Sequence, residues 1–185
     1  MKKTGQVSSE TGGSTGDLNI FQEVTKLAGD TPRSYNWYRD TVRSVAAKND
    51  VYSTLSTLEE VLIPTPGNLY LFEYKATYAK KINYYDEFPL VYVTQGGKNF
   101  SGANLHYLGY KARLNAILQL EQGVMEIPPQ CYHNYVQDGL ETPLFKINRE
   151  DYKSAIFLPV ENFVSRKKDS YKQLSKSFVW GDSKK

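Results

Sequence analysis

The chain has 185 residues, of which 40% are hydrophobic, so it is long enough to bury a core as one domain, and a two-domain organisation is disfavoured. Its 15 tyrosines outnumber its 8 phenylalanines, which suits half-buried sheet faces and wet interfaces between proteins. The net charge of +3 is concentrated at one end, because residues 166–185 carry seven Lys and Arg against two Asp. No apolar run could span a membrane and no secretory signal follows the first lysines, so we expect an intracellular protein without a membrane partner.

The two ends of the chain differ from its middle in composition. Residues 1–17 are mainly Gly, Ser, Thr and charged side chains, which predicts an arm that is disordered or bound to a partner. Residues 18–165 are expected to form a single domain of strands and helices. Residues 166–185 are predicted to be a basic C-terminal arm, which could contact either protein or nucleic acid.

Two helices are predicted at the start of the domain. The first ends at Gly29 and has one apolar stripe, made of Leu18, Phe21, Val24 and Leu27. The second begins after Ser34, a favourable N-cap residue, and its stripe is made of Tyr38, Val42, Val45 and Ala46. Arg39 and Arg43 share a different face of this second helix, where they could meet an anionic partner.

The middle of the chain predicts a meander of three antiparallel strands. Residues 68–75 alternate aromatic and other side chains after a Pro-Gly turn, and residues 88–93 and 103–108 form two further apolar runs. Gly96 and Gly97 suit a hairpin turn between the second and third strands, and the P-loop pattern is absent.

A change of period then predicts a helix over residues 110–122, capped by Gly123. Residues 143–147 and 154–160 are predicted to be short strands. These elements favour the α+β class, as a small antiparallel SH3-like β-barrel with helical additions and extended termini.

The few residues suited to catalysis form no recognisable constellation. Cys131 and His133 are two positions apart, but no second ligand pair has the spacing of a zinc site and no oxyanion motif accompanies them. His106 is interpreted as a hydrogen-bonded wall of a sheet rather than as a catalytic base. We therefore expect no catalytic residue, no metal and no cofactor.

The segment Tyr84-Tyr85-Asp86 is interpreted as a structural corner. Asp86 can accept hydrogen bonds from nearby backbone amides, and Pro89 can fix the start of the following strand. Because adjacent side chains point to opposite sides of an extended chain, one tyrosine ring should face inward and the other outward.

Residues that combine positive charge with aromatic surface are the candidates for partner binding. Cations beside aromatic rings suit both protein contacts and grooves that follow a nucleic-acid strand. The candidate residues are Lys80, Lys81, Tyr84, Tyr85, Arg166, Lys167, Lys168, Phe178 and Trp180.

The stretch "PGNLYLFEY" followed by "EFPLVYV" resembles the opening hairpin of SH3-like small barrels. The toxin endoribonucleases of the MazF and PemK type are similar in this stretch, which keeps a nuclease as a minor alternative. The basic and polar residues that those nucleases place after the first strand are not matched by "KATYAKKINYYD".

A longer resemblance runs from about residue 34 to the C-terminus. The stretches "SYNWYRDTVR", "NYYDEFPLVYV" and "GANLHYLGYKARLNAIL" are similar to a family of small proteins from T4-like tailed phages, including marine ones. The chain departs from that pattern at Asn83, where the family usually has proline, and at Gly109-Tyr110.

This resemblance implies a phage particle protein. The first hypothesis is a non-enzymatic structural component of the virion, in the tail or baseplate, bound to other virion proteins or to copies of itself. The alternative is a DNA-binding head, packaging or DNA-end protection factor, for which nucleic acid is the partner. In both cases the protein is expected in the virion, after assembly in the host cytoplasm.

Overall fold

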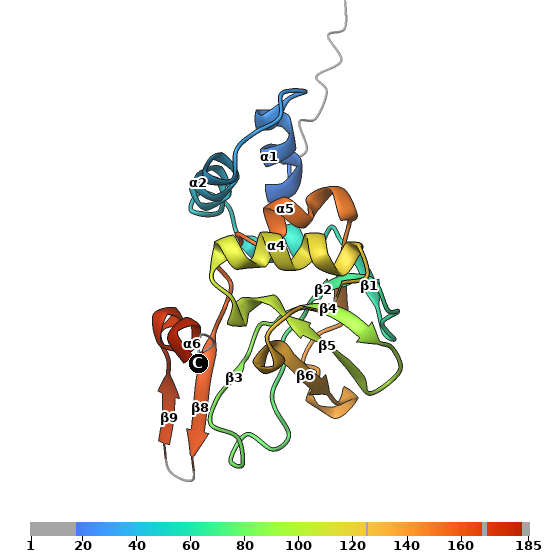
Figure 1. The fold of residues 1–185 in the computed structure, drawn as a ribbon, viewed down its shortest axis with the longest axis vertical. Coiled ribbons are helices and arrows are strands. Elements are labelled where there is room, and N and C mark those ends of the chain that lie inside the picture. The colour runs from blue at the N-terminus through green and yellow to red at the C-terminus, as the bar shows by residue number, and fades with distance from the viewer. Residues whose placement is uncertain (1–17, 125, 168–169, 183–185) are drawn as a thin grey trace, which may run out of the picture.

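The structure is a computed structural model that describes residues 18–124, 126–167 and 170–182 (Figure 1). The predicted N-terminal arm, residues 1–17, and the candidate residue Lys168 lie outside the described residues. Among the described residues, no helix is long and apolar enough to cross a membrane.

Two antiparallel sheets form the centre of the protein. The larger has the strand order β1-β7-β2-β4-β5-β6. Its strands are β1 (Glu59–Val61), β2 (Leu69–Leu71), β4 (Leu90–Gln95), β5 (Phe100–Asn104), β6 (Tyr132–Tyr135) and β7 (Leu144–Ile147). The smaller sheet has the order β3-β8-β9, formed by β3 (Tyr85–Asp86), β8 (Phe163–Lys167) and β9 (Ser170–Gln173).

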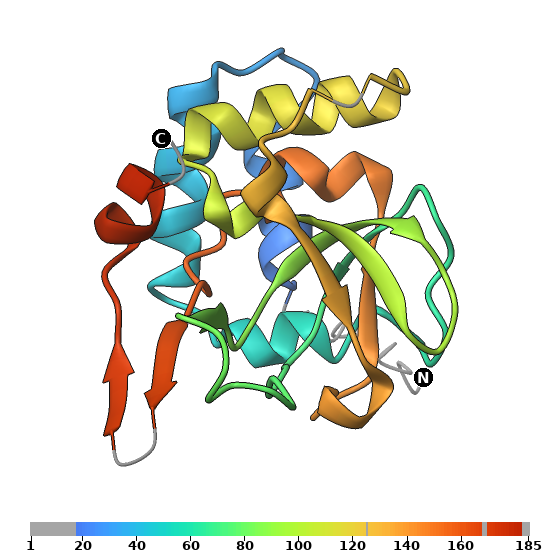
Figure 2. The same cartoon turned by 60° about the horizontal axis from the view of Figure 1, so that its bottom comes forward.

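Helices cover one face of the larger sheet. The α-helices are α1 (Ile20–Ala28), α2 (Tyr35–Ala46), α3 (Val51–Leu55), α4 (Tyr110–Glu121), α5 (Tyr152–Ala155) and α6 (Lys176–Asp182). Four short 3-10 helices complete the described chain: Leu105–Tyr107, Pro129–Cys131, Gln137–Gly139 and Arg149–Asp151. In Figure 1, α4 and α5 lie next to the sheet, and α1 and α2 lie beyond them. Figure 2 shows the β8-β9 hairpin and α6 along one side of the molecule.

The larger sheet is buried on both faces because its central strands alternate between two hydrophobic clusters. In β2, Leu69 and Leu71 join the cluster under the helices, whereas Tyr70 joins a smaller cluster on the opposite face. The same alternation holds in β4, where Leu90 faces the helices and Val91 faces away. The period of two that marks a strand therefore distributes the apolar side chains over two cores.

The two N-terminal helices are confirmed. Asn19 caps α1 in a capping box with Gln22, and the Ser34 hydroxyl accepts a hydrogen bond from the amide of Trp37 at the start of α2. The apolar stripe expected on α1 was partly wrong, because Leu18 and Leu27 are exposed. The buried face consists instead of Ile20, Phe21, Val24 and Ala28.

Two of the predicted strands were wrong in whole or in part. The run 103–108 ends as a strand at Asn104 and continues as the 3-10 helix Leu105–Tyr107, because the Asn104 side chain caps the backbone amide of His106. The run 154–160 contains no strand. It includes the end of α5, and its remaining apolar residues are buried in an irregular segment. The prediction failed because a short apolar run is compatible with a strand, a helix or an irregular buried segment.

The predicted α+β class with antiparallel pairing is confirmed. Gly97 has a positive φ of 131° in the β4-β5 connection, as expected for that hairpin. The larger sheet is open, since its strand order ends at β1 and β6 and no pairing joins these two strands in the described part of the chain. The closed SH3-like barrel is therefore not observed there.

The C-terminal segment packs against the body of the protein. Strand β8 begins at Phe163, before the boundary expected at residue 166, and pairs with β3 on one side and β9 on the other. In α6, Val179 is fully buried in the main core. The Trp180 ring donates a hydrogen bond from Nε1 to the carbonyl oxygen of His106 at 2.9 Å.

A buried ion pair connects α4 to the C-terminal segment. Arg113 and Glu161 have fully buried side chains, and Nη2 of Arg113 lies 2.7 Å from Oε1 of Glu161. The guanidinium also donates to the backbone carbonyls of Leu108 at 2.9 Å, Ile156 at 2.9 Å and His106 at 3.3 Å. Lys176 of α6 donates to the second carboxylate oxygen of Glu161 at 2.8 Å. Because the guanidinium and the carboxylate both have charged or hydrogen-bonding partners, these charges are tolerated in the interior.

Removing the arginine should be strongly destabilising. Arg113→Ala would remove a donor from three carbonyls, of which that of His106 keeps another donor, Trp180. It would also leave Glu161 with only one cation, so we expect the free energy of unfolding to fall by about 3–5 kcal/mol. Urea denaturation measures this loss. Lys146→Ala is the control, because its pair with Glu59 is exposed and should change stability by at most about 1 kcal/mol. Equal losses in the two variants would contradict this account.

Acid should weaken the fold through Glu161. Burial alone would raise the pKa of Glu161, but its electrostatic interactions with His106 and Arg113 and the hydrogen bond from Lys176 hold it at about 2, below the ordinary 4.5. This contribution to stability is complete above pH 4.5 and is lost as the pH falls toward 2, on the order of 3 kcal/mol in all. Urea denaturation at a series of pH values should show a shallower acid loss for Glu161→Gln than for the unmodified chain. Parallel curves would show that Glu161 does not titrate in this way.

Candidate functional site

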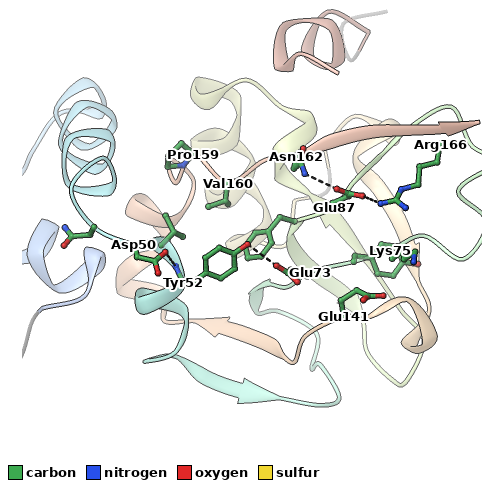
Figure 3. A pocket seen from close by; sticks show the side chains of 14 residues that line it. Asp50, Tyr52, Glu73, Lys75, Glu87, Glu141, Pro159, Val160, Asn162 and Arg166 are labelled. Atoms are coloured by element: carbon green, nitrogen blue, oxygen red, sulfur yellow. Dashed lines mark hydrogen bonds and ion pairs between the residues drawn. The ribbon is translucent and has the colours of Figure 1, made fainter. Parts of the chain in front are cut away.

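One pocket has more acidic than basic side chains in its lining (Figure 3). It has a volume of about 740 Å³ and lies between α3, the end of β2, the β3 corner and β8. Its carboxylates are Asp50, Glu73, Glu87 and Glu141, and its cations are Lys75 and Arg166.

Several of these groups are already paired. Glu87 accepts hydrogen bonds from Arg166 and Asn162, and Tyr52 donates to Glu73 at 3.1 Å, as the dashed lines in Figure 3 show. The remaining acidic charge would repel a phosphate group. This pocket is therefore a poor site for nucleic acid.

A second hollow has the opposite charge. We call it the basic groove; it has a volume of about 580 Å³ and lies between α2, the first turn of α4 and α6. Figure 2 shows α6 beside the start of α4. The residues that give the groove its character are Tyr35, Arg39, Arg43, Tyr110, Lys111 and Trp180.

The cations of the basic groove come from two helices. Arg39 and Arg43 lie one turn apart on α2, and Lys111 is in the first turn of α4. Arg43 and Lys111 are exposed, and Arg39 is partly exposed beside Asp40, whose carboxylate lies 2.8 Å from its Nε. That contact raises the pKa of Arg39 and lowers the pKa of Asp40, so both groups stay charged. The expected shared face of Arg39 and Arg43 is thus part of one basic surface.

The N-terminus of α4 adds backbone donors to the same groove. Its N-cap residue is Gly109, which has no side chain to accept a hydrogen bond from the first amides. Gly109, Tyr110, Lys111 and Ala112 all line the groove. Free amides at the start of a helix attract anions, phosphate groups among them.

Aromatic rings also line the basic groove. Two guanidinium groups lie over the Tyr110 ring, that of Arg43 at 4.8 Å and that of Arg113 at 4.6 Å from the ring centre. Trp180 contacts Tyr110 edge to face at 5.2 Å. Burial raises the pKa of Tyr35, against the opposing charges of Arg39, Arg113 and Arg43, so its hydroxyl stays neutral. All three rings are only partly buried, which leaves aromatic surface available to a ligand.

The interpretation of Tyr84-Tyr85-Asp86 as a structural corner is supported by its contacts. Asp86 accepts hydrogen bonds from the amides of Phe88 and Asn162, both at 3.1 Å, and its other oxygen lies 2.7 Å from Nδ1 of His106. Burial alone would raise the pKa of Asp86, but His106 and these hydrogen bonds lower it. Strand β4 begins at Leu90, directly after Pro89, as expected.

Cys131 and His133 do not form a reactive pair. Cys131 is fully buried, and burial raises the pKa of its thiol to about 12, so the thiolate needed for nucleophilic attack does not form near neutral pH. Burial also lowers the pKa of His133, although a hydrogen bond to the Gln130 backbone opposes this effect. Within the ranges that the structure describes, no cluster of three or more His, Cys, Asp or Glu could hold a metal ion.

The candidate partner-binding residues do not converge on one surface. Tyr84 is partly buried against Tyr107, Phe163 and the exposed ring of Phe178, whereas Tyr85 is buried, so the inward ring is that of Tyr85. The others are dispersed: Trp180 lines the basic groove, Arg166 lines the acidic pocket, and Lys80, Lys81 and Lys167 are exposed.

Sequence reasoning missed three residues of the basic groove: Tyr35, Tyr110 and Lys111. The only local signal was the glycine at the start of α4, which leaves the first amides uncapped. Nothing in the linear sequence places the first turn of α4 beside the arginines of α2, since roughly 70 residues of chain separate them.

These features define a small α+β protein with separate acidic and basic hollows on its surface. Residues 21–124, more than half of the chain, match the family of the phage T4 terminal DNA protecting protein, and the chain belongs to this family. The matched region includes α2 and the first turn of α4, and hence all three cations of the basic groove. No curated protein and no solved structure matches the chain. The expected relationship to a protein family of T4-like phages is confirmed.

Proposed function

We propose that this protein binds the ends of linear double-stranded phage DNA and shields them from exonucleases. The proposal takes its direction from the family, which is described by terminal DNA protection. The observation that carries it in this chain is the basic groove, where Arg39, Arg43 and Lys111 surround partly exposed aromatic rings. This DNA-end role replaces the tail or baseplate role as the preferred function.

The groove offers two kinds of contact that a DNA end needs. Its cations and the free amides of α4 can neutralise backbone phosphates, which is the main source of affinity for DNA. Its rings, Tyr35, Tyr110 and Trp180, can pack against a base face. Only at an end does a duplex expose the face of a base pair, so aromatic contacts of this kind favour ends over internal positions.

The role is proposed to be passive. A protein that occupies the last base pairs blocks an exonuclease without breaking a bond, so it needs no nucleophile or metal. On this view the protein acts in the virion or in the host cytoplasm, bound to the DNA termini, and contacts with other virion proteins are secondary. The acidic pocket shares no lining residue with the basic groove and is proposed to stay free of DNA.

The groove arginines should set both the affinity and its salt dependence. In Arg39→Ala/Arg43→Ala, binding to a blunt linear duplex should weaken about tenfold or more at low salt, and the slope of log affinity against log salt concentration should fall by about 2. Filter binding at several salt concentrations measures both quantities. Arg149→Ala/Lys153→Ala removes two exposed positive charges elsewhere and should retain most of the affinity and of the slope.

Protection of ends is tested separately from DNA binding. The protein should slow the digestion of a linear duplex by a processive exonuclease, and circular duplex of the same length should compete poorly for it. Equal competition by circular DNA would show general DNA binding without preference for ends. Affinity that does not depend on salt, or full protection by Arg39→Ala/Arg43→Ala, would exclude the basic groove as the site.

A further inference from the structure

A third hollow lies beside the basic groove and is lined by tyrosines. We call it the tyrosine pocket; it has a volume of about 300 Å³, at the small end of the range for small-molecule sites. It is bounded by the loop 76–82, by the β3 corner and by β6. Its aromatic lining is Tyr74, Tyr78, Tyr85, Tyr107, Tyr135 and His133.

The tyrosine pocket adjoins the basic groove through one side chain. Tyr107 lines both hollows and packs against Tyr84 and His133, with ring centres 6.0 Å and 4.4 Å away. A ligand held in the basic groove is therefore next to the tyrosine pocket.

Positive charge is found in the loop that forms one wall of this pocket. The loop that forms one wall carries Lys80 and Lys81, both exposed, and Nζ of Lys81 lies 5.3 Å from the centre of the Tyr78 ring. Tyr78 itself is 62% exposed at the edge of the pocket. Lysines around an aromatic pocket can hold the phosphates on either side of a base that enters it.

One polar atom in the lining lacks a partner. Nε2 of His133 is buried and has no hydrogen bond, whereas the ring is held through the Gln130 backbone. Because burial lowers the pKa of His133, the ring is neutral near pH 7, and a ring that donates from Nδ1 presents Nε2 as an acceptor. An amino group on the edge of a base could satisfy it.

From these contacts we propose that the tyrosine pocket binds an unpaired nucleobase at the end of the DNA. The inference rests on the proposed function and deepens it: the duplex lies in the basic groove, and a single-stranded extension passes Tyr107 and places one base among the tyrosines. Stacked aromatic rings flanked by cations are the usual means of binding single-stranded nucleic acid. An aromatic side chain of a partner protein would fill the same space, but it would make no use of Lys80 and Lys81.

The test uses the full chain and duplexes that differ only at one end. One duplex is blunt, and two carry a single unpaired 2-aminopurine, at the 3′ or the 5′ end. Binding of at least one extended duplex should quench the 2-aminopurine fluorescence through stacking, and that duplex should bind more tightly than the blunt one.

The variant Tyr78→Ala removes the exposed ring at the pocket mouth. It should weaken binding of the extended duplex about tenfold, reduce the quenching and leave the affinity for the blunt duplex unchanged. Tyr171→Ala is the matched control, because Tyr171 is 57% exposed and also lies under a cation, Arg166, at 5.2 Å, but does not line the pocket. It should change neither affinity. Thermal unfolding confirms that both variants are folded.

The outcomes separate this inference from the proposed function. If the blunt duplex binds but 2-aminopurine is not quenched in either extended duplex, the tyrosine pocket does not take a base, although end binding stands. The same conclusion follows if Tyr78→Ala and Tyr171→Ala behave alike. If the blunt duplex does not bind at all, the proposed function fails, whatever the extended duplexes show.

Discussion

The buried pair of Arg113 and Glu161 joins segments that are far apart in the sequence. Arg113 belongs to α4, and its guanidinium reaches the backbone on both sides of the core, at His106 and Ile156. Glu161 precedes β8 and also holds Lys176 of α6. If only one of these segments packed into the core, it would bury an unpaired charge at a high cost in free energy. The packing of α4 and of the segment that carries Glu161 is therefore coupled. The start of α4 and the C-terminal helix are thereby fixed relative to each other.

The basic groove depends on this arrangement. Trp180 forms one wall only because α6 is held against the body, where its indole donates to the carbonyl of His106, which also accepts from Arg113. Tyr110 lies between the groove cations and the buried arginine, with a guanidinium over its ring from each of two helices. The buried hydrogen-bond network and the proposed DNA-binding surface thus meet at Trp180 and Tyr110. A substitution in the network should therefore alter the geometry of the surface.

The acidic pocket and the basic groove have opposite charges, which the small net charge of the chain does not reveal. The net charge of +3 is modest, yet one pocket is lined by four carboxylates and the basic groove carries three cations beside helix amides. Such a separation can orient a protein on DNA, because the basic hollow attracts phosphates and the acidic hollow repels them. The tyrosine excess that first suggested protein interfaces is also explained in part by the tyrosine pocket and by the smaller core.

The sequence by itself determined the local elements with strong periodicity and good end signals. Residues such as Ser34, Pro89 and Gly97 act on their immediate neighbours, so the helix start, the strand start and the hairpin could be predicted from them. It also identified the phage relationship. Short strands such as β3 and β6, the open order of the sheet and the run 154–160 were decided by tertiary packing, since short apolar runs fit several states. Only the tertiary structure brought Arg39 and Arg43 to Lys111 and Trp180, because charges on separate helices become one surface only when the core that joins the helices has formed.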